Sequence, residues 1–182
     1  MIVATAARVR PTAFGRALDA LYDASAALGA MAMVMLLVMV MLSVISRIAG
    51  FNIPGVDAYA GYMMAGAGFL ALAHTLKKGE HIRVTLVLAA LRGKAKHALE
   101  VWALFAAMLL ALLSAFYSCR LAWQSYAFHD ISTSNDATPL WLPQLSMALG
   151  AVVLAVAFID ELVLELRGER VVPVSDEATR NE

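Results

Sequence analysis

Four long runs of almost uninterrupted apolar residues, separated by short polar stretches, organise the sequence. They cover residues 24–46, 58–76, about 98–122 and 140–159. Each run is close to the roughly 20 residues with which an α-helix crosses the hydrocarbon core of a bilayer. Transmembrane β-strands would instead alternate polar and apolar positions over shorter segments. The pattern therefore predicts an all-α integral membrane protein with four transmembrane helices.

The composition supports a membrane protein. Hydrophobic residues make up 62% of the 182 residues and charged residues 15%, compared with about 45–50% and about 25% in a soluble domain. A chain of this length cannot enclose so many apolar side chains in a core, so membrane lipid is the expected surrounding. The formal net charge is zero, which argues against a nucleic-acid partner. The single cysteine, Cys119, excludes an intramolecular disulfide.

Lysine and arginine residues are distributed unequally between the two ends of the predicted helices. Twelve lie in the N-terminal tail, in the segment between the second and third runs, and in the C-terminal tail, whereas Arg47 and Arg120 lie on the other side. Because positively charged segments stay in the cytoplasm, both termini are predicted to be cytoplasmic. The first run is longer than the about 7–15 residues of a signal-peptide core and is expected to be retained.

The predicted domain organisation follows from these runs. It consists of a cytoplasmic N-terminal segment (1–23), a membrane domain (24–166) and a flexible cytoplasmic tail (167–182). At the end of the second run, Lys77 and Lys78 suit a cytoplasmic helix end, and Gly79 suits its C-terminal cap. Residues about 80–96 then mix apolar and basic side chains in a segment too short to span a bilayer. We predict an interfacial amphipathic helix there.

Small residues recur in the second run at helical spacing, at Gly61, Ala65 and Gly68. Small side chains let helix backbones approach closely in lipid, where dispersion packing replaces the hydrophobic effect. Two interpretations stay open at this stage. The small residues form either a contact with another span of the same chain or a docking face for a partner protein.

The middle of each run carries no charged side chain. This argues against a self-sufficient proton or ion pathway, which usually needs an ionisable group at that depth. The histidines lie at or beyond the ends of the runs, which does not suit haem ligation. The H-E-x-x-H metal pattern does not occur. We therefore expect no enzyme activity, no catalytic residues, no metal site and no bound cofactor.

Three sequence elements occur in a characteristic order. They are "SRIAGFNIPGVD" after the first run, "GFLALAHTLKKGEHIRVTLVLAAL" from the second, and "PLWLPQLSMALG" at the start of the fourth. With this order, the chain resembles over about residues 20–165 the small membrane subunit of tripartite ATP-independent periplasmic (TRAP) transporters, the DctQ-type family. The residues that carry the resemblance are Gly79, His81 and Arg83, supported by Arg47, Trp141 and Pro143.

The resemblance implies one part of a three-part secondary transporter in the bacterial inner membrane. In this family a periplasmic substrate-binding protein captures an organic acid. A large membrane subunit then carries the acid together with sodium by an elevator movement. The small subunit, which this chain resembles, packs beside the large one and braces it. Sodium and substrate are accordingly expected to bind the large subunit and not this chain.

One region departs from the family pattern. The family often has two acidic residues and an arginine at the start of the second span. Here Asp57 fits one acid, but Ala58 and Gly61 stand at the other two positions. The sequence leaves open whether Arg47 pairs with Asp57 or both are solvated. It also leaves two other functions: a self-sufficient homo-oligomeric channel or exporter, and a membrane anchor for a redox enzyme.

Overall fold

The computed structural model describes residues 13–51, 53–78, 94–133 and 137–168. These residues form four α-helices, α1 (Ala13–Ile48), α2 (Val56–Lys78), α4 (Lys94–Ala127) and α5 (Trp141–Leu166). All four are long and apolar enough to cross a membrane. The prediction of an all-helical protein with four such helices is confirmed. Most of the expected interfacial helix, including Gly79, His81 and Arg83, lies outside the described residues, and residues 94–96 belong to α4.

The first helix begins well before the apolar run that predicted it. Residues 13–23, assigned from sequence to the N-terminal segment, are the first three turns of α1. Leu18, Tyr22 and Ser25 recur there at helical spacing and are all buried, so one face of these turns packs against the rest of the molecule. At its other end α1 finishes at Ile48 and is followed by Gly50, whose φ of +77° suits glycine. The Phe51 amide then donates to the Ser46 carbonyl at 3.1 Å, which closes a Schellman cap.

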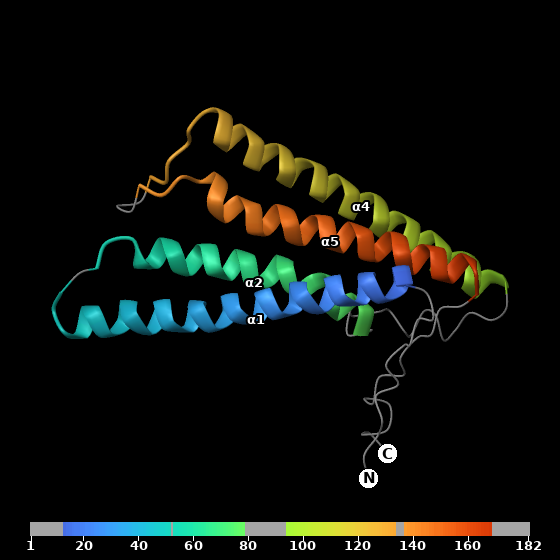
Figure 1. The fold of residues 1–182 in the computed structure, drawn as a ribbon, viewed down its shortest axis with the longest axis horizontal. Coiled ribbons are helices and arrows are strands. Elements are labelled where there is room, and N and C mark those ends of the chain that lie inside the picture. The colour runs from blue at the N-terminus through green and yellow to red at the C-terminus, as the bar shows by residue number, and fades with distance from the viewer. Residues whose placement is uncertain (1–12, 52, 79–93, 134–136, 169–182) are drawn as a thin grey trace, which may run out of the picture.

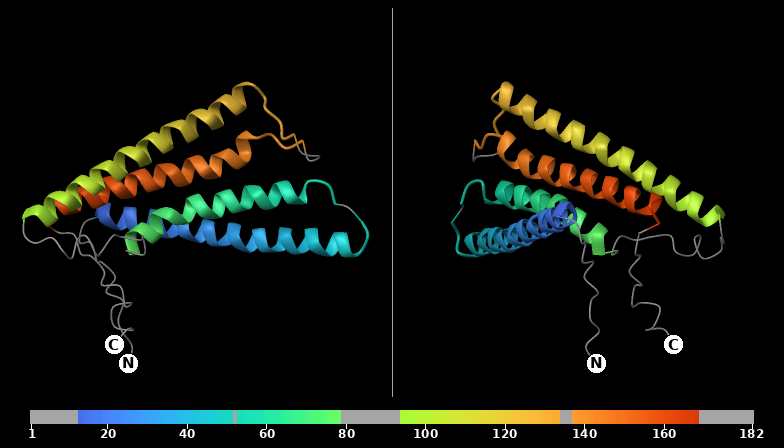
Figure 2. Two further views of the ribbon diagram at one scale, coloured as in Figure 1. Left: turned by 180° about the vertical axis from the view of Figure 1, so that it is seen from behind. Right: turned by 45° about the vertical axis from the view of Figure 1, so that its right-hand side comes forward.

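The four helices form two antiparallel hairpins, α1 with α2 and α4 with α5, which meet where α2 packs against α5 (Figures 1 and 2). The helices α1 and α4 therefore lie on the outside. One end of the molecule, here called the loop end, carries the two short connections from α1 to α2 and from α4 to α5. At the opposite end, here called the terminal end, α1 and α4 begin and α2 and α5 finish.

Small residues set the distances between neighbouring helices. A Cβ atom added at Gly29 of α1 would meet the backbone of α2 at the Ala71 nitrogen, at 3.2 Å. A Cβ atom added at Gly150 of α5 would lie only 2.5 Å from the carbonyl carbon of Phe69 in α2. The contact at Gly150 needs glycine, because a Cβ atom there would force the backbones apart, and Gly29 lets α1 and α2 approach closely. The Ser25 hydroxyl also donates to the Leu70 carbonyl at 2.6 Å, which joins α1 to α2.

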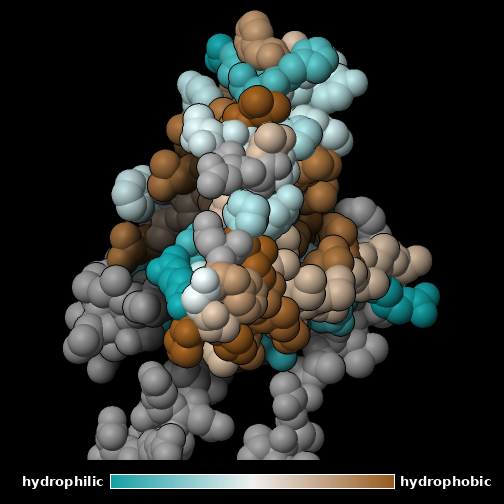
Figure 3. Space-filling model, turned by 90° about the vertical axis from the view of Figure 1, so that its left-hand side faces the viewer, coloured by the Kyte–Doolittle hydropathy of each residue, from teal (hydrophilic) through white to brown (hydrophobic). Residues whose placement is uncertain are grey.

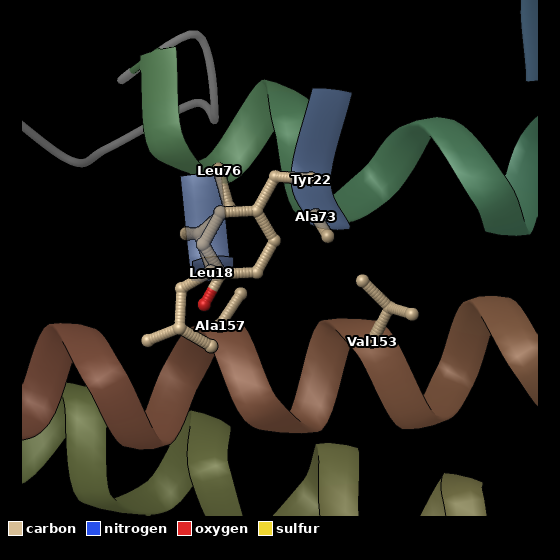
Figure 4. Close-up of a cluster of buried hydrophobic side chains, with 6 residues drawn as sticks. All are labelled: Leu18, Tyr22, Ala73, Leu76, Val153 and Ala157. Atoms are coloured by element: carbon tan, nitrogen blue, oxygen red, sulfur yellow. The ribbon is translucent and has the colours of Figure 1, made fainter. Parts of the chain in front are cut away.

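The main apolar cluster lies towards the terminal end, where three helices meet (Figure 4). Each of α1, α2 and α5 contributes two of its side chains. They are Leu18, Tyr22, Ala73, Leu76, Val153 and Ala157. A second cluster of four alanines, Ala111, Ala115, Ala151 and Ala155, joins α4 to α5. These clusters hold the outer helices on the α2–α5 pair, so the two hairpins form one packed unit.

Large apolar side chains cover much of the outer surface, as expected where lipid or a partner helix is the neighbour. The central part of α1 is the least buried of the four spans, and Met31, Met33 and Met35 are exposed along it. Figure 3 faces the loop end and shows hydrophilic residues gathered over the α4–α5 connection, with hydrophobic residues along the flanks. The polar α4–α5 connection and the hydrophobic flanks fit a protein whose sides face a membrane.

Candidate functional site

A cluster of charged groups is buried where α1, α2 and α5 meet at the terminal end. The Lys77 ammonium of α2 contacts the Asp160 carboxylate and lies 2.9 Å from the Glu161 Oε1 atom of α5. The side chains of Lys77 and Asp160 are each 12% exposed, and that of Glu161 is 4% exposed. We call these three side chains, together with Tyr22, the ion cluster. Charges so well shielded from water need close partners, because desolvation alone would make them unfavourable.

Tyr22 of α1 completes the ion cluster from a third helix. The Lys77 Nζ atom lies 5.3 Å from the centre of the Tyr22 ring, within the range of a cation–π contact. The Tyr22 hydroxyl donates a long hydrogen bond of 3.5 Å to the Asp160 Oδ2 atom. The ring itself belongs to the main apolar cluster (Figure 4). The ion cluster therefore fixes the rotation of three helices about their axes as well as their separation.

Two histidine–carboxylate pairs lie at the same end, one inside each hairpin. His74 of α2 lies 3.4 Å from Asp23 of α1. His97 of α4 lies 3.0 Å from Glu165 of α5, measured from Nδ1 to Oε1. Glu165 is buried, while His97 is largely exposed. Together with the ion cluster, these pairs join each helix at the terminal end to a neighbour.

An exposed ion pair joins α1 to α2 at the loop end. The Arg47 Nη2 atom lies 2.7 Å from Asp57 Oδ2, and both side chains are 70% exposed. The Ser43 hydroxyl donates to the other Asp57 oxygen at 2.7 Å. Of the two arrangements that the sequence left open for Arg47 and Asp57, the structure contains the ion pair. Its exposure indicates a small contribution to stability, because solvent screens such pairs and their side chains lose entropy.

Replacing Arg47 with methionine is therefore expected to change the free energy of unfolding by less than about 1 kcal/mol. The measurement is the melting temperature of the purified protein in detergent, compared with that of an Arg120→Met variant, which alters an exposed arginine of α4. Both variants should melt within about 3 °C of the parent. A much larger loss for Arg47→Met alone would mean that the Arg47–Asp57 pair is a main support of the α1–α2 hairpin.

Aromatic side chains gather near the loop end. Trp141, the first residue of α5, meets Tyr126 of α4 edge to face at 5.7 Å. The Tyr59 hydroxyl lies 3.0 Å from the Thr138 hydroxyl, which links α2 to the α4–α5 connection. Pro143 lies in the first turn of α5, where its carbonyl accepts a hydrogen bond from Ser146 at 2.7 Å. Tryptophan and tyrosine favour the boundary between lipid and water, so this group marks one membrane surface.

Of the small residues predicted to form a face in the second run, the two glycines make no close contact with the other described residues. Gly61 and Gly68 are exposed, and a Cβ atom added at either would meet nothing within 4 Å among the described residues. Ala65 between them is half-buried. The contacts of α2 with its neighbours use Gly66 and Ala67 instead. We call the exposed strip of α2 from Gly61 to Gly68 the glycine face.

Sequence reasoning singled out some of these residues and missed others. The sequence predicts the same role for Lys77 and Lys78, as positive charges at a helix end, but only Lys77 enters the ion cluster, while Lys78 is exposed. Tyr22, Asp160 and Glu161 were not singled out. The sequence does contain one indication: two acidic residues directly follow the fourth apolar run, at the same predicted membrane depth as the two lysines that end the second run. Opposite charges at one depth favour a contact between the helices, but they do not indicate which of the two lysines makes it.

The ion pairs described above all join one helix to another, and the helices carry apolar flanks between polar ends. The protein is therefore a multi-pass α-helical membrane protein. Among the described residues, its ion pairs join neighbouring helices. A family model for tripartite ATP-independent periplasmic transporters, DctQ component, matches residues 36–168. This match covers most of the sequence, and the chain belongs to that family. The resemblance drawn from the sequence is thus confirmed, and no curated protein matches the chain.

Proposed function

We propose that this chain is the small membrane subunit of a sodium-coupled transporter for organic acids, and that it braces the large transport subunit. Membership in the DctQ component family supports a role in a tripartite transporter, with a large membrane subunit and a periplasmic binding protein as partners. The family consists of transporter components and not of enzymes. The observation that carries the bracing role is the glycine face of α2.

The glycine face is suited to a partner helix for two reasons. Exposed glycines at this spacing let a second backbone approach closely, which strengthens dispersion contacts in lipid. The same chain leaves them uncovered, since nothing among the described residues lies within 4 Å of a Cβ added at Gly61 or Gly68. Of the two interpretations from the sequence, these contacts favour a docking face. The occupant we propose is a helix of the large subunit.

The packing of the chain also suits a brace. A fixed frame beside a moving transport domain must resist sliding and rotation of its own helices. The close approach of Gly150 to Phe69 limits sliding of α5 against α2, and the ion cluster limits their rotation. Sodium and the organic acid would bind the large subunit. The lysine and arginine distribution favours an orientation with the terminal end in the cytoplasm. The family supports the bacterial inner membrane as the location.

Replacing Gly68 with leucine should separate docking from folding. We expect the variant chain to fold normally, because a Cβ atom at Gly68 meets none of the described residues within 4 Å. We expect it to recover about tenfold less large subunit on affinity purification, since a contact loss of about 1.4 kcal/mol has that effect. The matched control is Ala103→Leu, which adds bulk at an exposed position of α4.

The identity of the partner is tested by purifying the tagged chain gently from its native membrane and identifying the accompanying proteins by mass spectrometry. A multi-span membrane protein at near-equal abundance supports the proposed function. Recovery of the chain alone as a stable oligomer would favour the self-sufficient channel or exporter instead. Normal recovery of the large subunit with Gly68→Leu would overturn the glycine face as the docking surface, and with it the observation that carries the bracing role.

A further inference from the structure

Three potential metal ligands meet between α4 and α5 at the terminal end. His97 and Glu100 lie in the first turns of α4, and Glu165 lies near the end of α5. One ligand atom from each of the three side chains lies within 4.8 Å of the other two. Among the described residues this is the single group of three such side chains. This group joins α4 to α5, whereas the ion cluster joins α1, α2 and α5, and the two share no residue.

The spacing on α4 suits a shared ligand. Residues three apart on an α-helix face the same direction, so His97 and Glu100 reach a common point. The same three-residue separation of a histidine and a glutamate supplies metal ligands in helical bundles that hold iron or manganese. The third ligand comes from the antiparallel neighbour helix, whose Glu165 carboxylate already lies 3.0 Å from the His97 ring. An ion at this point would therefore be held by two helices.

The ligand types indicate which ion fits. An imidazole with two carboxylates suits zinc and similar divalent transition ions, with bonds of about 2.0–2.2 Å. Ligand atoms around such an ion lie roughly 3.3–3.5 Å apart when its geometry is tetrahedral. The three ligand atoms, which lie within 4.8 Å of one another, would therefore move closer together when an ion binds. Calcium and magnesium prefer an all-oxygen shell. The imidazole therefore argues against both.

Burial differs between the three ligands in a way that suits binding from solution. The Glu165 carboxylate is nine-tenths buried and fixed on α5, whereas the His97 side chain is 59% exposed. An ion can reach the site from the exposed side and keep water as its remaining ligand. Without an ion, the His97 Nδ1–H donates to Glu165. When an ion takes Nδ1, the ring proton is carried by Nε2, as in other metal-bound histidines.

We propose that His97, Glu100 and Glu165 bind one zinc-class divalent ion, and that this ion cross-links α4 to α5 at the terminal end. The site departs from the expectation, drawn from the sequence, that the chain holds no metal. The ion would act as a structural link between the outer helix of the second hairpin and the α2–α5 pair. It needs no part in transport chemistry.

The test uses the full-length chain with its co-purified partners, isolated with a tag that contains no histidine and treated with a chelator. Binding of Zn²⁺ is measured by titration calorimetry, and Co²⁺ is used as a coloured substitute whose visible bands report its ligands. We expect one Zn²⁺ per chain, a higher melting temperature with Zn²⁺, and visible Co²⁺ bands. His97→Ala and Glu100→Gln should each weaken binding at least about tenfold, since even lost outer-shell partners have effects of that order.

His74→Ala is the matched control, because His74 also faces a carboxylate, that of Asp23, but belongs to no group of three among the described residues. It should leave Zn²⁺ binding unchanged. Glu100→Gln is the conservative variant, since it keeps size and removes only charge. No Zn²⁺ binding by the folded parent protein, or equal binding by the parent, His97→Ala and Glu100→Gln, would overturn the proposal.

Discussion

Replacing Lys77 with methionine is expected to lower the free energy of unfolding by about 3–5 kcal/mol, because it leaves two buried carboxylates without their shared ammonium. Both carboxylates lie on α5 and contact Lys77 from positions that are 12% and 4% exposed. Methionine is similar to lysine in length but carries no charge, so the loss of stability measures the effect of the charge rather than that of side-chain volume. The melting temperature in detergent should fall by roughly 10 °C.

Lys78→Met is the matched control for this prediction. Lys78 is the next residue of α2, carries the same charge and is exposed, so its removal should cost less than about 1 kcal/mol. Lys77→Arg is a second comparison, because it retains the charge but changes the geometry of its donors. Equal melting temperatures for Lys77→Met and Lys78→Met would show that the ion cluster contributes nothing specific to stability.

The contrast between these two lysines shows what the sequence could and could not predict. Composition and the length of the apolar runs are enough to predict four membrane-spanning helices. The two lysines are equivalent in those terms. Their difference comes from a rotation of 100° per residue about α2 and from the position of α5. That position depends on contacts between residues more than 80 apart in the sequence.

The start of α1 was missed for a related reason. Arg16, Asp19 and Asp23 interrupt the apolar pattern, so a search for apolar runs places the beginning of the span after them. Leu18, Tyr22 and Ser25 nevertheless form a buried face on the same turns. Their partners are on α2 and α5, and nothing in the first segment indicates those helices. Patterns within one helix predict that a face is buried, but they do not identify what buries it.

The glycines also show that spacing within one helix does not identify which residues make the contacts between helices. The spacing of Gly61 and Gly68 drew attention to α2, while Gly150 stood among several small residues of the fourth run and was not singled out. The structure reverses their roles inside the chain. A Cβ atom at Gly150 would lie 2.5 Å from the Phe69 carbonyl carbon of the other hairpin, whereas a Cβ atom at Gly61 or Gly68 would meet none of the described residues within 4 Å. Residue type and spacing are similar in both helices, so the distinction depends on the packing alone.

Gly150→Leu is expected to have the second-largest effect on stability, with a loss of about 2–3 kcal/mol from overpacking. A Cβ atom at this position would lie 2.5 Å from the Phe69 carbonyl carbon and 2.6 Å from its oxygen. Those atoms belong to the backbone of α2 and cannot rotate away, so α2 and α5 must separate. Gly150→Ala should show the same direction of change with a smaller loss, because alanine also favours the helix by about 1 kcal/mol.

The same substitutions at Gly68 allow stability and binding of the large subunit to be compared between an exposed and a buried glycine. At Gly68, alanine and leucine should leave the melting temperature of the chain unchanged or higher, since neither meets a neighbour and both favour the helix. At Gly150 both the melting temperature and the recovery of the large subunit should fall, because the brace itself is loosened. At Gly68, leucine should reduce recovery alone. A fall in stability at Gly68, or none at Gly150, would mean that the α2–α5 packing described here is not the one that supports the assembly.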